Sequence, residues 1–364
     1  RDVLGSRGLG DVYKRQVKKK RRSTRRKGSS GNKWKALAVV AVVLAAIVYY
    51  LFFSSMAGGA GNTCIRIDTD DNIDSVLVKV KRVSKPVPYQ VFRRLLLWSD
   101  YADNIQTGRY RVGSEGALQT YRHIHNGAQA SETLTLKSVR TKADLAREVS
   151  RVLMFTSAEL LDSLNDPKVC KRSGYTPETV VGMFIPNSYD LYWDISVSDF
   201  LKRMDKESKR FWNEDRMKKA QDMGLSQNEV ITLASIVDEE TNDESEMPKV
   251  AGMYINRLND GMRLQADPTV KFATGNFKAK RIYKEMLSAD SPYNTYRHKG
   301  LPPGPIRIPS VAAIDAVLDY AHHDYMYMCA KPDFSGSHNF AKTYEEHQRN
   351  AKDYADALDK RGIQ

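Results

Sequence analysis

An uninterrupted apolar run near the N-terminal end constrains the fold of this chain more than any other feature. Ala36 to Phe53, ALAVVAVVLAAIVYYLFF, contains 18 residues without a charge or a proline. At ~1.5 Å per residue, a helix of this length spans roughly 27 Å, close to the hydrocarbon thickness of a bilayer. Trp34, Tyr49 and Tyr50 lie near its ends, where amphipathic rings favour the interface. The run therefore predicts a single transmembrane helix over residues 36–53.

Two other structures can contain such a run. A cleaved signal peptide is the closer alternative, because small residues follow in FFSSMAGGAGN, although the run is longer than a usual signal core. A buried core helix is disfavoured because the run has no polar face. The preceding segment, Lys18 to Lys35, holds 10 basic residues and no acid. This charge asymmetry predicts that the arm is cytoplasmic and that the chain beyond Phe53 lies outside the cytoplasmic membrane.

The first 16 residues are set apart from functional reasoning. The chain does not begin with Met, and Ser6 to Gln16, SRGLGDVYKRQ, resembles the in-frame translation of a sequencing-library adapter. We therefore expect residues 1–16 to be an assembly artefact within a basic cytoplasmic arm that covers residues 1–35.

The basic arm also accounts for most of the net charge of +13. Residues 1–35 contain 14 Lys and Arg with 2 acidic residues, whereas the remaining 329 residues contain 43 basic and 42 acidic residues. Because the main body is electrically balanced, the chief argument for a nucleic-acid partner disappears.

The cysteines and histidines do not form a metal-binding pattern. Cys64, Cys170 and Cys329 are widely spaced, so we interpret them as small apolar residues, with one Cys–Cys bridge as the alternative. His322 and His323 are adjacent, and their side chains point apart on any helix or strand. His338 and His347 lie in a polar stretch without Cys or carboxylate partners at ligand spacing. We predict no metal and no cofactor.

Beyond the apolar run, the sequence predicts an α+β protein in two parts. Residues 54–63 are small and polar and are predicted to form a flexible tether. Residues 64–132 contain strand-like CIRI, the helical pattern VPYQVFRRLLLWSDYADNI and a strand in TGRYRVGSEG, which together indicate a small α+β module. From Thr133 a strand, TLTLKSV, leads into the helix TKADLAREVSRVL, and a larger α+β region continues over residues 133–364.

Three consecutive acids close a strongly apolar helix in this larger region. Ser226 and Glu229 form a capping box at its start. At about 100° per residue, one face collects Val230, Leu233, Ala234 and Val237. Glu240 falls on the flank of that face, Glu239 points almost directly away from it, and Asp238 lies between them. Glu239 is therefore predicted to be solvated.

The position of Glu240 gives it a chemical use. A carboxyl that faces the protein interior tends to keep its proton, which is what a general acid at neutral pH requires. The alternative is a buried glutamate paired with Arg257 or Arg263, which spacing alone does not exclude. Two later loops, NDGMRLQADPTV and SPYNTYRHKGLPPGPIRIPS, are rich in the amides, carboxyls and aromatic rings that bind sugars, although rigid turns have a similar composition.

Three motifs, ASIVDEET, NRLNDGMRLQADPTV and SPYNTYRHKGLPPGPI, resemble the endolytic murein lytic transglycosylases of the MltG/YceG-like family. The resemblance covers most of the chain, and it implies a LysM-like module over residues 64–132 and a YceG-like catalytic domain over residues 133–364. The catalytic glutamate of the family falls on Glu240. Asp238 stands where the family usually has Glu, and Glu239 where Lys is frequent, so neither is expected to be essential.

Other positions of the family motifs imply residues that bind substrate. They are Asn256 and Arg257 in INRL, Gln265 and Asp267 in LQADPTV, and Tyr293, Asn294, Thr295 and Tyr296 in YNTY. The loop FIPNSYDLYW departs from the family pattern, because Asn187 and Ser188 replace an Asp and a Thr. This departure weakens the case that the loop supplies a catalytic carboxylate.

The resemblance implies a bacterial inner-membrane enzyme that acts outside the cytoplasm on peptidoglycan glycan strands. It would cut between N-acetylmuramic acid and N-acetylglucosamine without water, with Glu240 as acid and then base, and leave 1,6-anhydro ends. The implied partners are glycan strands, the lipid bilayer and, as candidates, peptidoglycan synthases (penicillin-binding proteins). The alternatives are a hydrolytic muramidase that also uses Asp267, and a glycan-binding scaffold without catalysis.

Overall fold

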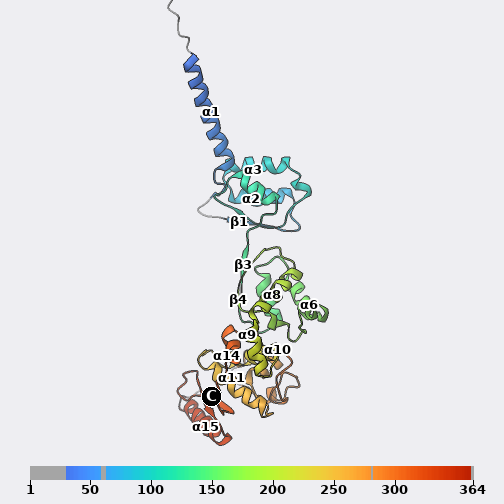
Figure 1. Cartoon of the computed structure of the whole chain (residues 1–364), viewed down its shortest axis with the longest axis vertical. Helices are drawn as coiled ribbons and strands as arrows, with labels where there is room; N and C mark the ends of the chain where they lie inside the picture. Colours follow the sequence, from blue (N-terminus) through green and yellow to red (C-terminus); the bar gives the residue numbers. More distant parts are fainter. Residues whose placement is uncertain (1–29, 59–62, 280–281, 362–364) are drawn as a thin grey trace, which may run out of the picture.

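The computed structural model describes residues 30–58, 63–279 and 282–361, which form an elongated molecule (Figure 1). Residues 1–16, interpreted above as an artefact, and most of the basic arm lie outside this range. A long helix projects from one end, and three packed units follow it along the axis. The described strands form three separate two-stranded antiparallel sheets among many helices. The predicted α+β class is confirmed.

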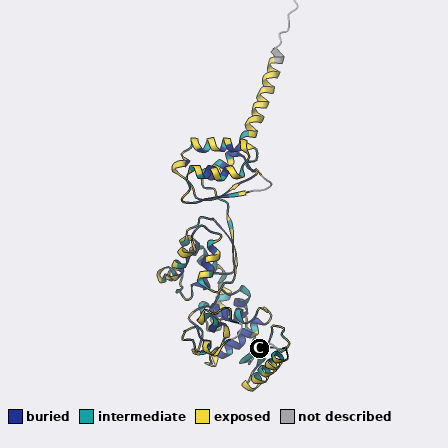
Figure 2. Cartoon of the chain, turned by 180° about the vertical axis from the view of Figure 1, so that it is seen from behind, coloured by how far each residue is buried: buried dark blue, intermediate teal, exposed yellow. Residues whose placement is uncertain are grey.

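The apolar run forms the projecting helix, α1 (Ser30–Phe53). Lys33–Phe53, 21 residues, are long and apolar enough to cross a membrane by length and composition. Figure 2 shows this helix exposed along its length, and none of the apolar window is buried against the rest of the chain. This exposure argues against the alternative of a buried core helix.

The first packed unit, which we call the small module, follows α1. Its strands β1 (Thr63–Ile67) and β2 (Gly108–Val112) pair antiparallel, with Ile65 opposite Tyr110. Its helices are α2 (Ile73–Val83), α3 (Pro86–Trp98), the short 3₁₀ helix η1 (Tyr101–Asp103) and α4 (Ala117–His125). Alternate strand residues and one face of each α-helix form its core, which includes Ile67, Val76, Phe92, Tyr110 and Ile124. The module contains both predicted strands and the predicted helix, which ends at Trp98 and does not continue to Ile105. Helix α2 was not indicated by the patterns above.

The predicted flexible tether is wrong for its first half. Met56 is completely buried in the core of the small module, and Ala57 forms a β-bridge with Ser84. The backbone N–H groups of Met56 and Ala57 donate to the carbonyl oxygens of Glu115 (3.0 Å) and Gly113 (2.9 Å). The small residues here allow close backbone approach and do not mark a loose linker. The small module therefore begins within a few residues of the end of α1.

The second unit is joined to the small module by a β-ribbon, β3 (Glu132–Leu136) with β4 (Asn187–Leu191). The side chains of Thr107 and Gln129 from the module both donate to Asp194 just beyond β4, at 2.7 and 3.0 Å. The predicted strand and helix at the start of this region are present as β3 and α5. The helices of the unit are α5 (Lys142–Ser150), α6 (Ser157–Asn165), α7 (Pro167–Arg172), η2 (Val180–Met183) and α8 (Val197–Phe211).

The third unit surrounds α10 (Gln227–Glu240), which packs against α11 and α14. The other elements of this unit are α9 (Glu214–Asp222), α11 (Met247–Asn259), α12 (Asp267–Thr274), α13 (Lys284–Leu287), α14 (Val311–Leu318), β5 (Tyr327–Ala330), β6 (His338–Ala341) and α15 (Tyr344–Lys360). The region predicted as one domain thus contains two hydrophobic cores. Ile308, just before α14, belongs to the core of the second unit and joins the two.

The three cysteines are free thiols in the structure, which removes support for the bridge alternative. Cys170 is buried in the core of the second unit, as expected for a small apolar residue. Cys64 and Cys329 are only partly buried.

Candidate active site

The C-terminal end of α10 brings a carboxyl group to the candidate site. The helix starts with the predicted capping box, in which Ser226 and Glu229 each bond the backbone N–H of the other. The residues from Val230 to Asp238 are all buried, because α11 and α14 cover the helix. Glu240 is the last residue of the helix and lines a cavity. A rigid, enclosed helix thus fixes the position of this side chain.

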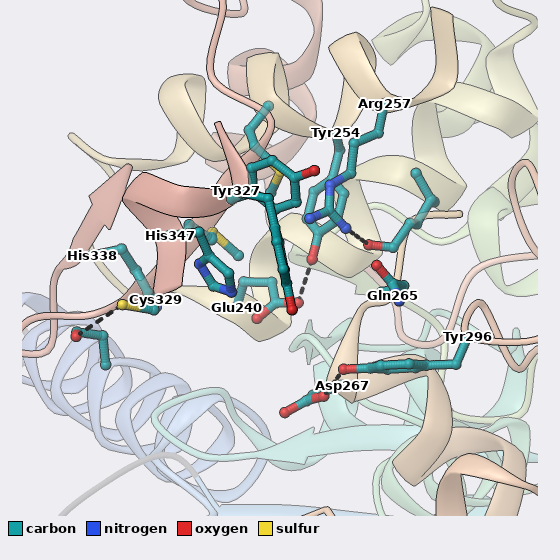
Figure 3. A pocket seen from close by; sticks show the side chains of 15 residues that line it. Glu240, Tyr254, Arg257, Gln265, Asp267, Tyr296, Tyr327, Cys329, His338 and His347 are labelled. Carbon is teal, nitrogen blue, oxygen red and sulfur yellow. Dashed lines mark hydrogen bonds between the residues drawn. The ribbon is translucent and has the colours of Figure 1, made fainter. Parts of the chain in front are cut away.

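The cavity has a volume of about 520 Å³ and opens to solvent (Figure 3). Its walls come from α10, α11, the loop that leads into α12, and the C-terminal elements β5, β6 and α15. The lining is polar and aromatic, which suits a sugar better than an apolar ligand. It comprises Glu240, Met253, Tyr254, Arg257, Leu264, Gln265, Asp267, Tyr296, Tyr327, Met328, Cys329, Ala330, His338, Tyr344 and His347.

Glu240 has the protonation behaviour that its helical position predicted. Dense protein around the carboxyl raises its pKa to about 7, although one side remains open to the cavity. The hydroxyl of the buried Tyr254 donates to Oε1 at 2.6 Å and opposes this rise, whereas the negative charge of Asp267 adds to it. A substantial fraction of Glu240 therefore carries a proton at neutral pH.

The alternative of a buried Glu240–arginine pair does not hold for the described residues. The guanidinium of Arg257 lines the cavity but donates to two backbone carbonyl oxygens, those of Met326 and Leu264, each at 2.6 Å. These bonds fasten the segment before β5 and the loop before α12 to α11. Arg263 contributes its carbonyl oxygen to the same guanidinium at 3.5 Å.

Asp267 is the second carboxyl group of the cavity. It occupies the first position of α12 and accepts a hydrogen bond of 2.6 Å from the hydroxyl of Tyr296. Burial and this carboxylate together raise the pKa of Tyr296 far above its ordinary value, so the phenol remains a donor. Gln265, two residues earlier, has φ of 53°, a left-handed conformation that is uncommon for a residue other than glycine. Such backbone strain is frequently found at binding sites.

Two of the predicted substrate-binding residues belong to the scaffold of the loop. Asn294 is fully buried, and its side-chain amide donates to the carbonyl oxygens of Leu287 (3.0 Å) and Ala289 (2.9 Å). Thr295 is buried as well, and its hydroxyl accepts the backbone N–H of Ala266 at 2.9 Å. Asn294 thus shapes the loop that carries Tyr296, and Thr295 ties that loop to the one that carries Gln265; neither residue lines the cavity.

Two further predicted residues lie apart from the cavity. The side chain of Asn256 donates to the carbonyl oxygens of His323 (2.7 Å) and Tyr325 (3.0 Å), which holds the segment that leads to β5. Tyr293 lines a separate cavity of about 350 Å³ beside Lys142 and Phe272. The structure thus brings together Glu240, Arg257, Gln265, Asp267 and Tyr296 from the predicted set.

The prediction that Glu239 is solvated is wrong. Only 13% of its side chain is exposed, and it accepts two hydrogen bonds from Arg140 (2.7 and 2.9 Å) and one from Arg307 (3.0 Å). Asp238 is buried, accepts the hydroxyl of Ser310 at 2.6 Å and pairs with Arg307 at 3.1 Å. We call Asp238 and Glu239, together with Arg140 and Arg307, the acidic junction. It ties the end of α10 to the segments before α5 and α14.

Sequence reasoning missed the C-terminal wall of the cavity. His338 pairs with Glu246 through Nδ1 at 2.8 Å, and His347 stacks on Tyr327 with ring centroids 5.3 Å apart. The local sequence around both histidines shows no Cys or carboxylate partner at ligand spacing, because Glu246 lies far away along the chain. Tyr254 was also missed, although it directly precedes the INRL motif on α11 and its position could have drawn attention to it.

Comparison with known families agrees with this arrangement. The sequence model of the YceG-like family matches residues 65–353, which is most of the chain. The chain belongs to the YceG-like family. The structure of this family member also resembles a crystal structure of a yceG-like protein from Listeria monocytogenes, with a TM-score of 0.53 and 25% identity. The match covers 79% of this chain and 98% of the Listeria chain.

Two relatives carry functional names. An endolytic murein transglycosylase of Bacillus subtilis is 37% identical over 163 residues, which are 44% of this chain and 44% of the relative. An endolytic murein transglycosylase of Streptococcus pneumoniae is 28% identical over 184 residues, which are 48% of this chain and 32% of the relative. The chain therefore matches less than half of the length of either relative.

Proposed function

We propose that this chain is an endolytic peptidoglycan lytic transglycosylase that cleaves the bond between N-acetylmuramic acid and N-acetylglucosamine. The observation that carries the proposal is Glu240, a carboxyl with a pKa of about 7 that opens into a polar cavity of about 520 Å³. Membership of the YceG-like family and the names of the two relatives support the choice of substrate. The chemistry requires no cofactor.

In the first step, the protonated Glu240 gives its proton to the glycosidic oxygen, the bond from that oxygen to C1 breaks, and positive charge develops at C1. In the second step, the Glu240 carboxylate takes the proton of the C6 hydroxyl of the same muramyl residue while that oxygen bonds to C1. The product is a 1,6-anhydro end, and Glu240 regains its proton. Tyr254 holds Oε1, which leaves the other carboxyl oxygen for substrate.

We assign Asp267 to electrostatic stabilisation of the positive charge at C1. Tyr296 fixes its carboxylate with a hydrogen bond of 2.6 Å, so the charge is oriented before substrate binds. Arg257, Gln265 and Tyr296 are proposed to contact the sugars from the cavity wall. Asn256, Asn294 and Thr295 are proposed to act only through the shape of that wall, and Tyr293 through the neighbouring cavity.

A hydrolytic muramidase is the second candidate, because Asp267 provides a second carboxyl in the same cavity. Product analysis separates the two. The full chain, solubilised in detergent, is incubated with purified glycan strands, and the new ends are identified by mass spectrometry. We expect 1,6-anhydro ends, which are lighter than reducing ends by the mass of one water. Reducing ends would identify a muramidase, and intact strands would favour the non-catalytic scaffold.

We also propose that α1 anchors the protein in the bacterial cytoplasmic membrane, with the basic arm inside and the catalytic units outside. The apolar span Lys33–Phe53 and the basic Lys18–Lys35 segment support this orientation. Protease added outside spheroplasts should digest the chain beyond Phe53. Protection of that region would reverse the topology and remove access to peptidoglycan.

The small module is proposed to be a LysM-like unit that holds glycan strands or orients the catalytic units. Its own hydrophobic core, separate from the other two, supports an independent role. Deletion of residues 64–132 should weaken binding to peptidoglycan sacculi, whereas unchanged binding would reduce the module to a spacer. Peptidoglycan synthases (penicillin-binding proteins) are proposed as partners of the anchored protein.

A further inference from the structure

One helix of the small module exposes an apolar and cationic face to solvent. Helix α3 buries Tyr89, Phe92 and Leu96 in the core of the module. Its opposite side carries Val87, Gln90, Arg94, Leu97 and Trp98, which share one arc at helical spacing and are all exposed. We call this set the outer face of α3.

The outer face of α3 differs from the rest of the described surface. Trp98 is 83% exposed, the highest value among the large apolar side chains of the described residues. Leu97 and Val87 are 42% and 44% exposed beside it. No carboxylate pairs with Arg94, or with the neighbouring Arg93, in the part of the chain that the structure describes. Exposed tryptophan together with unpaired arginine is typical of side chains at a membrane interface.

Helix α3 lies beside the C-terminal end of α1, the helix that is long and apolar enough to cross a membrane. Helix α1 contacts both α3 and α4, and the buried Met56 fastens the end of α1 to the module. A Cβ atom on Gly116, just before α4, would lie 2.3 Å from the carbonyl oxygen of Phe52, so the backbones are in close contact. Figure 1 shows α3 beside the end of α1, on the side of the module away from the catalytic units.

The length of the span then places α3 at the lipid headgroups. The 21 residues of Lys33–Phe53 extend ~32 Å as a helix, which matches the ~30 Å hydrocarbon core of a bilayer. The membrane surface must therefore lie close to Phe53, only a few residues before the buried Met56. The module has little clearance from that surface, because its chain is packed from residue 56 onward.

We propose that the outer face of α3 lies on the surface of the bilayer that α1 spans. In this position Val87, Leu97 and Trp98 enter the boundary between headgroups and acyl chains, and Arg94 binds lipid phosphate groups. Once α1 spans the bilayer, phospholipid already lies next to the outer face of α3, and no additional protein is needed to cover it. The proposal rests on the membrane anchor proposed above and adds a second contact, which fixes the tilt of the module.

Tryptophan quenching by brominated phospholipids tests this contact in the full chain. Trp193 and Trp212 are buried in the other two units, so quenching in brominated nanodiscs should come from Trp34 and Trp98. Each of these two rings should contribute about half of the quenched signal if both lie at a membrane interface. We therefore expect Trp98→Phe and Trp34→Phe each to remove about half of the quenching.

The two variants separate the face from the anchor. If Trp34→Phe abolishes quenching and Trp98→Phe leaves it unchanged, α1 is inserted but the outer face of α3 is not on lipid, and the proposal is overturned. If wild-type protein shows no quenching, the anchor and the α3 contact both fail. Arg94→Glu should reduce the Trp98 contribution in nanodiscs with anionic lipid, whereas Arg151→Glu, an exposed change on the second unit, should leave it unchanged.

Discussion

The carboxyl groups on the two sides of the C-terminal end of α10 have different surroundings. On one side, Asp238 and Glu239 form the acidic junction with Arg140 and Arg307. On the other side, the adjacent Glu240 faces the cavity with a tyrosine hydroxyl as its bonded partner. Burial of a carboxyl favours its neutral form, and burial is the main cause of the raised pKa of Glu240. Adjacent carboxyl groups of one helix end thus differ in their surroundings, with ion pairs around Asp238 and Glu239 and a cavity beside Glu240.

The largest expected effect comes from replacing Glu240, the proposed proton donor. Glu240→Gln keeps the size of the side chain but cannot transfer a proton, so the rate of glycan cleavage should fall ~10²–10⁴-fold, equivalent to about 3–5 kcal/mol of barrier. The release of anhydro ends from purified strands measures this rate. Glu244→Gln is the matched control, because that acid is exposed just beyond α10. Cleavage at wild-type speed by Glu240→Gln would refute the assignment.

The same variant should reveal the cost of ionising Glu240. The pKa is about 7 in the folded protein and 4.5 in its ordinary setting, so the folded state retains a proton that the unfolded chain loses between these values. The contribution of Glu240 to wild-type stability should thus fall as pH rises through this window, by about 3 kcal/mol in total. Glu240→Gln does not titrate in this window. In urea unfolding, the stability of the variant minus that of the wild type should therefore increase by about 3 kcal/mol between the two pH values. A pH-independent difference would contradict the raised pKa.

A substitution in the acidic junction should lower the stability of the fold without changing the rate of strand cleavage. Glu239→Gln leaves Arg140 and Arg307 without their full carboxylate partner, which should cost about 1–3 kcal/mol of folding free energy. Well below the unfolding temperature, the variant should cleave strands at close to the wild-type rate. Loss of cleavage with unchanged urea unfolding would transfer the catalytic role from Glu240 to Glu239.

The smallest expected effect concerns the hydrogen bond that Tyr254 donates to Glu240. That bond lowers the pKa of the carboxyl, so Tyr254→Phe should raise it further. The alkaline fall in kcat/KM should move to higher pH by up to about one unit. A pH–rate profile of strand cleavage measures the shift. If the profile moves to lower pH, the bond does not act on the ionised form as the geometry indicates.

The periodicity of α10 distinguished Glu240 from the two acids before it, whereas its proposed role came from the resemblance. Its capping box, its apolar face and the interior direction of Glu240 follow from residues within one helix, and the structure confirms each of them. The strands β1, β2 and β3 were likewise visible as short alternating segments between turn residues. Features that depend on neighbours in the sequence were therefore predictable.

The errors share a different cause, because each depends on residues far away in the sequence. Glu239 is shielded by Arg140, which precedes it by 99 positions, and no helical wheel contains that partner. Met56 is buried by the small module, although its local sequence reads as a linker. His338 pairs with Glu246, which precedes it by 92 positions. Local patterns describe a helix face, but long-range packing decides what covers it.

The C-terminal wall of the cavity has a consequence for the order in which the protein is made. Glu240 and Tyr254 leave the ribosome well before Tyr327, His338 and His347, which line the same cavity from β5, β6 and α15. A partly synthesised chain already contains Glu240, but about half of the residues that line the cavity around it have not yet been made. The cavity around Glu240 is therefore complete only after β5, β6 and α15 have been made and have packed into place.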